Sequence, residues 1–287
     1  MKLSVHDFTV TGLMAMAFTF VLAACGGPGT ATPGGGLMYQ VPDPPTLRYV
    51  TGDTTNIDVD AGAMGSMRMR STSVATVRFA FERTAAGLQV TATFEELDAR
   101  MTQPMGGAQT ASTEDVEGPL VFTMTKEGDA EVVTMPELSG AGASLANPHV
   151  FAYEFFPRLP GGVVNPGEMW TDTIAYDADL PDGSVSSTSV LTYTLRGDTL
   201  VDGQDLLWVT YEGDADVVGQ AVTQGMDVTQ TFSGQVEGIF FWDPVQATMV
   251  WGESSHDMDG TVDVPAAGMP PMPMTARGTS HIRLAGS

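Results

Sequence analysis

Hydrophobic and polar residues alternate along much of the chain beyond residue 45. Residues 74–82 read VATVRFAFE, which places Val77, Phe79 and Phe81 at every second position. Residues 88–95 alternate in the same way, and the four residues 84–87 between the two segments can turn. A period of two puts every apolar side chain on one face of a strand, so this region predicts a long β-hairpin.

Further segments share this period and are rich in Thr, Val, Phe, Tyr and Trp, which suit a half-buried pleated surface. These predicted strands are 120–125, 168–174, 185–195, 206–211, 226–232, 239–242, 248–251 and 276–284. One segment differs: Asn147 is suited to cap a helix, Pro148 to occupy its first position, and Pro157 to end it. The sequence therefore predicts one short helix near 148–156, packed on a mainly antiparallel all-β fold.

Short motifs recur in the same order in the two halves of this region. The tetrapeptide STSV occurs at 71–74 and again at 187–190, and VEG occurs at 116–118 and again at 236–238. We therefore expect a single β-rich domain, 46–287, made of two similar β-meanders of about 46–140 and 160–287. The meanders would form either a curved, half-barrel-like sheet around the helix or a sandwich.

The N-terminal residues have the features of an export signal. An apolar run over residues 8–21 is shorter than the roughly 20 residues of a typical membrane-spanning helix, and it leads into Leu22-Ala23-Ala24-Cys25. This ending resembles the lipobox of bacterial lipoproteins. The resemblance implies that residues 1–24 are removed and that Cys25 carries lipid, which would make the membrane a partner of the chain. An uncleaved anchor or a buried helix is the alternative interpretation.

The residues that follow Cys25 bear on location and reach. Residues 25–45 are rich in Gly and Pro, which predicts a tether rather than packed structure. Gly26 and Gly27 directly follow the cysteine. By resemblance to the sorting rules of Gram-negative lipoproteins, they favour the outer membrane of the cell envelope, an inference that a Gram-positive source would remove. The expected body also resembles, in architecture alone, the half-barrel carriers of lipoproteins and lipids in the periplasm.

Charge and cysteine content exclude several functions. The chain has 35 acidic and 12 basic residues, a formal net charge of −23. Nucleic-acid binding needs clustered Lys and Arg, so no nucleic-acid partner is expected. Cys25 is the single cysteine, which excludes an intramolecular disulfide.

No motif in the sequence predicts catalysis or a cofactor. Ser254, His256 and Asp257 are close in sequence, but neighbouring residues of a strand point to opposite faces and cannot form a triad by themselves. Asp177, Asp179 and Asp182 with Gly183 resemble a calcium loop, yet their spacing departs from the EF-hand pattern. A hairpin turn surrounded by solvated carboxylates is the simpler interpretation, and we expect a protein that is not an enzyme.

Methionines form a second candidate metal site. The same spacing occurs twice, and thioether ligands select Cu(I). The alternative is an adaptable apolar surface, because methionine packs flexibly against soft partners. The residues are Met64, Met67, Met69, Met269, Met272 and Met274.

The leading hypothesis is an outer-membrane lipoprotein without catalytic activity that binds a lipid, a lipidated client or an envelope protein in a β-lined concavity. The candidate lining residues are Phe79, Phe81, Phe94, Phe122, Trp208 and Trp242. A surface adhesion or structural module is the alternative, followed by a protein that handles copper or calcium. A hollow concavity would favour the first hypothesis, and a filled core with an apolar patch outside would favour the second.

Overall fold

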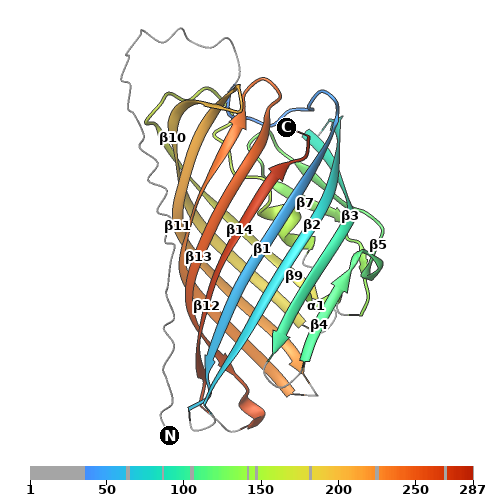
Figure 1. Ribbon diagram of the computed structural model, residues 1–287, viewed down its shortest axis with the longest axis vertical. Helices are drawn as coiled ribbons and strands as arrows, with labels where there is room; N and C mark the ends of the chain where they lie inside the picture. The colour runs from blue at the N-terminus through green and yellow to red at the C-terminus, as the bar shows by residue number, and fades with distance from the viewer. Residues whose placement is uncertain are drawn as a thin grey trace, which may run out of the picture. The chain divides into compact units, whose positions relative to one another are not determined.

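Long antiparallel strands dominate the chain, as the alternation of the sequence predicted (Figure 1). The computed structural model describes residues 36–62, 65–85, 87–103, 107–140, 142–145, 148–180, 183–223, 226–267 and 270–286. All of them belong to one unit, from Gly35 to Ser287. The predicted signal peptide and Cys25 lie outside the described residues.

Eight strands, β1 to β8, precede the two α-helices. They are β1 (Thr46–Asp60), β2 (Ser66–Thr84), β3 (Gly87–Gln103), β4 (Gly107–Ser112), β5 (Val116–Glu117), β6 (Leu120–Met124), β7 (Ala130–Thr134) and β8 (Glu137–Leu138). The remaining strands are β9 (Met169–Leu180), β10 (Gly183–Val201), β11 (Gln204–Thr223), β12 (Met226–Asp243), β13 (Thr248–Asp263) and β14 (Met272–Leu284). The helices are α1 (Gly142–Leu145) and α2 (Pro148–Tyr153), with 3-10 turns at Thr113–Asp115 and Pro265–Ala267.

Eleven of the strands form two successive meanders within one curled sheet, in the order β7-β6-β3-β2-β1-β14-β13-β12-β11-β10-β9. Strand β4 pairs with β3 beside this path, and β5 and β8 form a separate two-stranded sheet. The hairpins β2–β3 and β10–β11 each turn through two residues, since Thr84 pairs with Gly87 and Val201 with Gln204. The two meanders join where the first strand pairs with the last, from Tyr49 opposite Leu284 to Val59 opposite Met274. This β1–β14 seam is visible in Figure 1 as the blue strand beside the red one.

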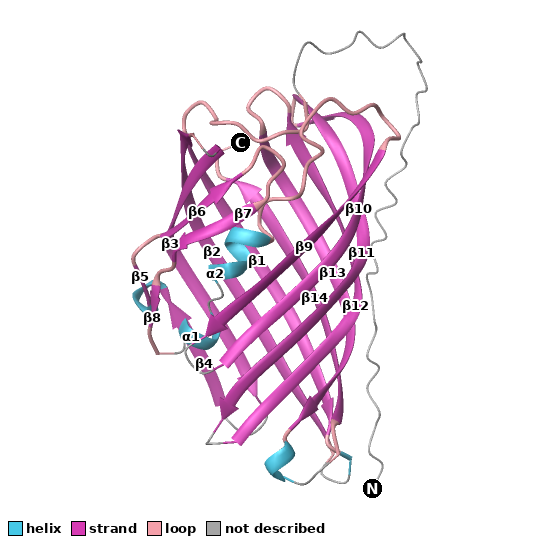
Figure 2. Cartoon of the chain, turned by 180° about the vertical axis from the view of Figure 1, so that it is seen from behind, coloured by secondary structure: helices cyan, strands magenta, loops and turns pink. Residues whose placement is uncertain are grey.

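The sheet does not close on itself, and its outer strands β7 and β9 are not paired with each other. Helix α2 contacts β6, β7 and β9, so it occupies the gap between the two edges (Figure 2). The amide of Phe155 donates to the carbonyl of Val150 at 3.0 Å, a wide turn that ends the helix after six residues. The helix is therefore shorter than predicted, and Asn147, its expected cap, lies outside the described residues.

A β-bulge changes which side chains of β3 face the inside of the curl. Thr76 pairs with Glu96 and Val77 with Phe94, so Glu95 has no partner across the strand pair. The extra residue shifts the alternation by one place, and both Phe94 and Leu97 face inward. The side chain of Glu95 turns outward and accepts Arg48 at 2.6 Å and Arg78 at 3.1 Å.

The largest buried cluster fills one end of the curl. At that end the concave face of the sheet packs against α2, against the residues after it and against the segment before β1. Phe156 is edge-on to Tyr39 at 5.6 Å and to Phe79 at 5.1 Å. Aromatic pairs of this kind contribute about 0.5–1.5 kcal/mol beyond the burial of their area.

Three expectations about the extent of elements need correction. The predicted tether, 25–45, reaches into the body, because Leu37 and Tyr39 are buried and the Tyr39 hydroxyl donates to the carbonyl of Pro157 at 2.8 Å. Strand β1 was not predicted, because the residues at its centre are polar. It is held in the sheet by pairing with β2 on one side and β14 on the other. Residues 226–232 and 239–242 form one strand, β12, because β11 and β13 hold the glycine-containing stretch between them in register.

No helix in the described part of the chain is long and apolar enough to cross a membrane.

Tyr49 provides a test of how the curl is held together. Its side chain is fully buried, and its hydroxyl lies 2.7 Å from Thr248 Oγ1 and donates to the carbonyl of Met249 at 2.7 Å. Tyr49→Phe removes this link between β1 and the start of β13. We expect the free energy of unfolding to fall by about 1–3 kcal/mol, the usual cost of leaving a buried polar group without its partner.

Urea unfolding measures this change. The control is Thr171→Ala, which removes an exposed hydroxyl pair on the convex face, Thr171 with Thr192 at 3.0 Å. It should stay within about 0.5 kcal/mol of the unsubstituted chain. Equal effects of the two substitutions would contradict the role given to Tyr49.

Candidate ligand cavity in the concave face

The concave face of the sheet encloses a cavity of about 460 Å³ beside α2. Its walls come from β1, β2, β3 and β9–β14, and α2 with the residues after it also lines it. The packed core adjoins it directly, since Phe155 and Phe240 belong to the core and also line the cavity. The concavity is therefore neither wholly packed nor wholly empty: one end holds the aromatic core, and the middle remains open.

Small residues at inward-facing positions leave this space. Strands β11–β14 place glycine repeatedly on the face that lines the cavity, where a larger side chain would fill it. These glycines are Gly213, Gly219, Gly234, Gly238, Gly252, Gly260 and Gly278. Glycine in the interior of a strand weakens the strand and often marks a place where something else approaches the backbone closely.

Two inward-facing rings lie directly over glycines of the neighbouring strand. A side chain at Gly238 would collide with the ring of Tyr211, and one at Gly278 would collide with the imidazole of His256. Each ring is the direct cross-strand partner of its glycine. Because the two glycines carry no side chain, the rings can lie against the backbone of the neighbouring strand.

Most of the cavity wall is apolar. It includes Phe94 and Leu97 from either side of the β3 bulge, and Val217, Val236 and Met258 from the opposite wall. Small-molecule sites have this character: a mainly apolar surface of roughly 300–1,000 Å³ with a few polar groups that orient the ligand.

Glu154, just after α2, is the central polar group. Its carboxylate accepts hydrogen bonds from the hydroxyls of Tyr176 and Ser187. Tyr176 is held in turn by a parallel stack with Tyr153, with ring centres 4.9 Å apart. Surrounding protein raises the pKa of Glu154, and the two hydroxyls oppose that shift. The side chain nevertheless remains exposed within the cavity.

Hydroxyl groups continue this polar strip across the cavity. Tyr211 is hydrogen-bonded to Ser254, whose Oγ lies 2.6 Å from Ser280 Oγ. Burial raises the pKa of Tyr211 to about 12. On the adjoining wall Ser73 donates to Asp53 at 3.1 Å. The cavity therefore combines an apolar surface with a line of hydroxyls that ends at carboxylates.

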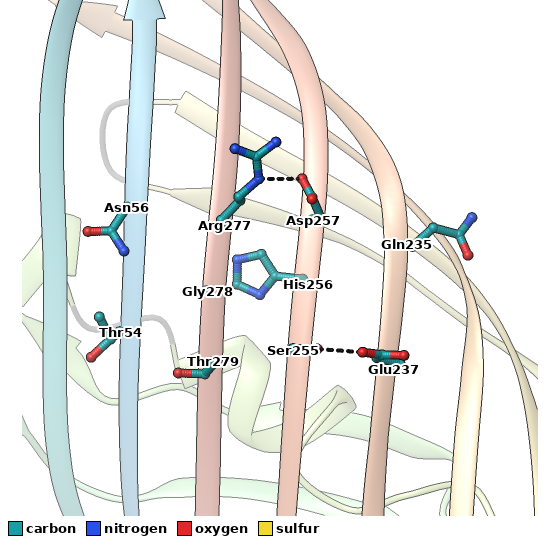
Figure 3. A pocket seen from close by; sticks show the side chains of 10 residues that line it. All are labelled: Thr54, Asn56, Gln235, Glu237, Ser255, His256, Asp257, Arg277, Gly278 and Thr279. Atoms are coloured by element: carbon teal, nitrogen blue, oxygen red, sulfur yellow. Dashed lines mark hydrogen bonds and ion pairs between the residues drawn. The ribbon is translucent and has the colours of Figure 1, made fainter. Parts of the chain in front are cut away.

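A second hollow lies on the convex face of β1 and β12–β14 and has a different character (Figure 3). It is more open than the concave cavity, and most of the residues that line it are polar. Arg277 donates to Asp257 at 2.9 Å beside it, with both side chains well exposed. Exposed ion pairs of this kind contribute little to stability or affinity. The concave cavity is less open and has the larger apolar lining, so it is the better candidate for a binding site.

The six predicted lining aromatics have three different positions. Phe94 lines the cavity. The others on the concave face are buried in the aromatic core and fill it instead of bordering a hollow: Phe79, Phe81, Phe122 and Trp242. Trp208 lies on the convex face, where it pairs with Phe241, and 41% of its surface is exposed. Phe241 stacks on Trp251 at 5.5 Å, so an aromatic row crosses the outside of β11–β13.

The two methionine sets are brought together by the β1–β14 seam. Val59 of β1 pairs with Met67 on one side and Met274 on the other. Met67, Met69, Met272 and Met274 all pack in one apolar cluster around Val59 and Val262. Met64 and Met269 lie outside the described residues. This packing favours the interpretation of an adaptable apolar surface over a copper site.

The other sequence candidates are dispersed. Ser254 and His256 line the cavity, whereas Asp257 points outward to Arg277. Asp177 and Asp179 are exposed on the edge strand β9, and Asp182 lies outside the described residues. Within the described ranges, no three His, Cys, Asp or Glu side chains lie close enough to hold a metal ion.

Sequence reasoning missed the polar strip of the cavity. Glu154 is the one charged residue in the apolar stretch VFAYEFF, residues 150–156. A lone carboxylate among aromatics is a signal of a specific environment, because burying a charge without partners is costly. Its partners Tyr176 and Ser187 come from strands that only the folded sheet brings together.

No protein-family model matches the chain, and no curated protein matches it. Similar solved structures include two mutants of a porin from Rh. blastica, at 11% and 10% identity, each with a TM-score of 0.23. Both matches cover 83% of this chain and 99% of the porin. A third is OpdQ of Pseudomonas aeruginosa, at 7% identity and a TM-score of 0.19, covering 86% of this chain and 100% of that one. Scores this low say nothing about what the chain binds.

The raised pKa of Glu154 predicts a pH-dependent stability. A carboxyl that holds its proton more tightly when folded makes the free energy of unfolding fall as pH rises from its ordinary pKa of 4.5 through the raised value. Glu154→Gln removes this dependence. The unfolding free energy of the original chain minus that of the variant should fall as pH rises across that range and then become constant. Two parallel pH profiles would contradict the assignment.

Proposed function

We propose that the chain is a lipoprotein of the bacterial cell envelope that binds a lipid-like molecule in its concave cavity. The observation that carries the proposal is the open, mostly apolar cavity of about 460 Å³ between α2 and β11–β14. A single-domain protein without a ligand gains stability by filling such a space. Glycines at the facing positions keep it open instead, which supports a role for the space itself.

The convex face supports attachment through lipid and not through the strands. Its side chains include Asp214, Glu237, Asp257 and Arg277, which suit contact with water. Charged residues on a lipid-facing strand surface cost up to about 2–4 kcal/mol each at the middle of a bilayer. We infer that the body lies in an aqueous compartment and that lipid on Cys25 holds it at the outer membrane.

The small number of residues between Cys25 and the described body fits this arrangement. The described residues begin at Gly36, eleven residues after Cys25. A chain of that length reaches at most about 35–40 Å when fully extended. The body would therefore stay close to the membrane surface, where a binder of lipid-like molecules meets its ligand.

A surface adhesion module is a second candidate. The observation in its favour is the outward aromatic row of Trp208, Phe241 and Trp251. Exposed apolar patches mark interaction sites when they are contiguous. The enclosed cavity is the larger apolar feature, and we place the ligand-binding role first.

A cavity-filling substitution tests the binding role. Ala215 lines the cavity and is 5% exposed, so Ala215→Trp should occupy the space that a ligand needs. The unit from Gly35 to Ser287 should bind the neutral apolar dye N-phenyl-1-naphthylamine with increased fluorescence. We expect Ala215→Trp to weaken dye binding at least tenfold.

The matched control is Val218→Trp on the convex face of the same strand, which should leave dye binding unchanged. Overpacking costs about 1–3 kcal/mol, so the smaller change Val217→Phe provides a second reading if the first variant unfolds. The proposed function fails if the unsubstituted unit binds no dye, or if both tryptophan variants bind it equally.

The anchor has its own test. Cys25→Ser removes the thiol that would carry the lipid, so the full chain should shift from the detergent phase to the aqueous phase when bacterial membranes are extracted. Stable anchoring requires about two acyl chains, because one chain binds only weakly. A variant that remains in the detergent phase would show that another segment holds the chain.

A further inference from the structure

The charges around the cavity all have one sign. Among the described residues whose side chains face it, the carboxylates are Asp53 and Glu154, and no Lys or Arg takes part. His256 adds no positive charge near neutral pH, because burial lowers its pKa. The cavity is therefore acidic as well as apolar.

Glu154 has acceptor capacity left over for a ligand. An ionised carboxylate can accept about four hydrogen bonds, and Tyr176 and Ser187 supply two of them. The stack of Tyr153 on Tyr176 fixes the direction of one donor. The remaining lone pairs belong to a side chain that is exposed in the cavity, so a bound molecule that donates hydrogen bonds there would complete the set.

The surroundings of Glu154 separate a polar end from an apolar end. Tyr211 and Ser254 extend the polar strip next to it. Beyond them lies an apolar cluster of Ala215, Met258 and Ala276, packed by Val217 and Val236. A molecule with its polar group at Glu154 would lay its apolar part along this cluster.

From these features we infer that the cavity takes a cationic amphiphile, an apolar chain or ring that carries a single amine, with its ammonium group on Glu154. The inference rests on the proposed function and names the class of its ligand. An ammonium group donates three hydrogen bonds and neutralises the carboxylate, whereas a fatty acid or a phosphate would place a second negative charge beside it. The net charge of −23 also attracts cations and repels anions at long range.

Competition among three ligands of equal chain length tests the inference. Dodecylamine, 1-dodecanol and dodecanoate are each titrated, below the concentration at which they aggregate, against N-phenyl-1-naphthylamine bound to the unit from Gly35 to Ser287. We expect dodecylamine to displace the dye at concentrations at least tenfold lower than 1-dodecanol, and dodecanoate to be the weakest competitor.

Variants then assign the preference to one residue. Glu154→Gln should reduce the amine to the level of the alcohol and leave the alcohol unchanged. Glu154→Asp, which keeps the charge, should retain most of the preference. The matched control is Glu212→Gln, an exposed residue next to Tyr211 on the convex side, which should change nothing.

The outcomes separate the inference from the proposed function. A preference for dodecanoate, or an amine affinity that survives Glu154→Gln, would overturn the inference and leave apolar binding intact. Failure of the dye and of all three competitors to bind the unsubstituted unit would overturn both.

Discussion

The pairing of the first strand with the last gives the molecule its concave face. Strands β1 and β14 run antiparallel from Tyr49 opposite Leu284 to Val59 opposite Met274, and they make one sheet of two meanders. Without this seam each meander would end in an exposed edge and enclose nothing, because a short stack of strands cannot curl far enough. Tyr49 reinforces the seam from within by its bonds to Thr248 and Met249.

The cavity exists because side chains fill the inside of the curled sheet unevenly. Aromatic side chains after α2 and before β1 pack one end, as the contacts of Phe156 show. In the middle, glycines of β11–β14 contribute no side chains, and Tyr211 and His256 lie flat over two of them. The same helix that closes the gap between β7 and β9 leads into Glu154, so the closure of the sheet and the polar end of the cavity are set by one short segment.

The sequence predicts the class of fold better than it predicts the site. Period-two alternation identified the hairpin at Val77 and Phe79, since burial on one face is a local property of a strand. It missed β1, whose polar centre is held by its neighbours, and it placed Trp208 in the concavity although that residue faces outward. Glu154, Tyr176 and Ser187 lie far apart in the chain, and only the register of the sheet unites them. The cavity exists because several glycines lie on the inward face of the sheet. Which glycines face inward can be known only from the register of the strands.

Native mass spectrometry of the protein purified from a bacterial envelope tests most directly whether the concave cavity exists to hold a ligand. We expect a fraction of the protein to carry one small apolar molecule, which is released when organic solvent unfolds the sheet. A spectrum that shows the bare chain alone, from protein whose cavity also excludes added apolar dye, would contradict it.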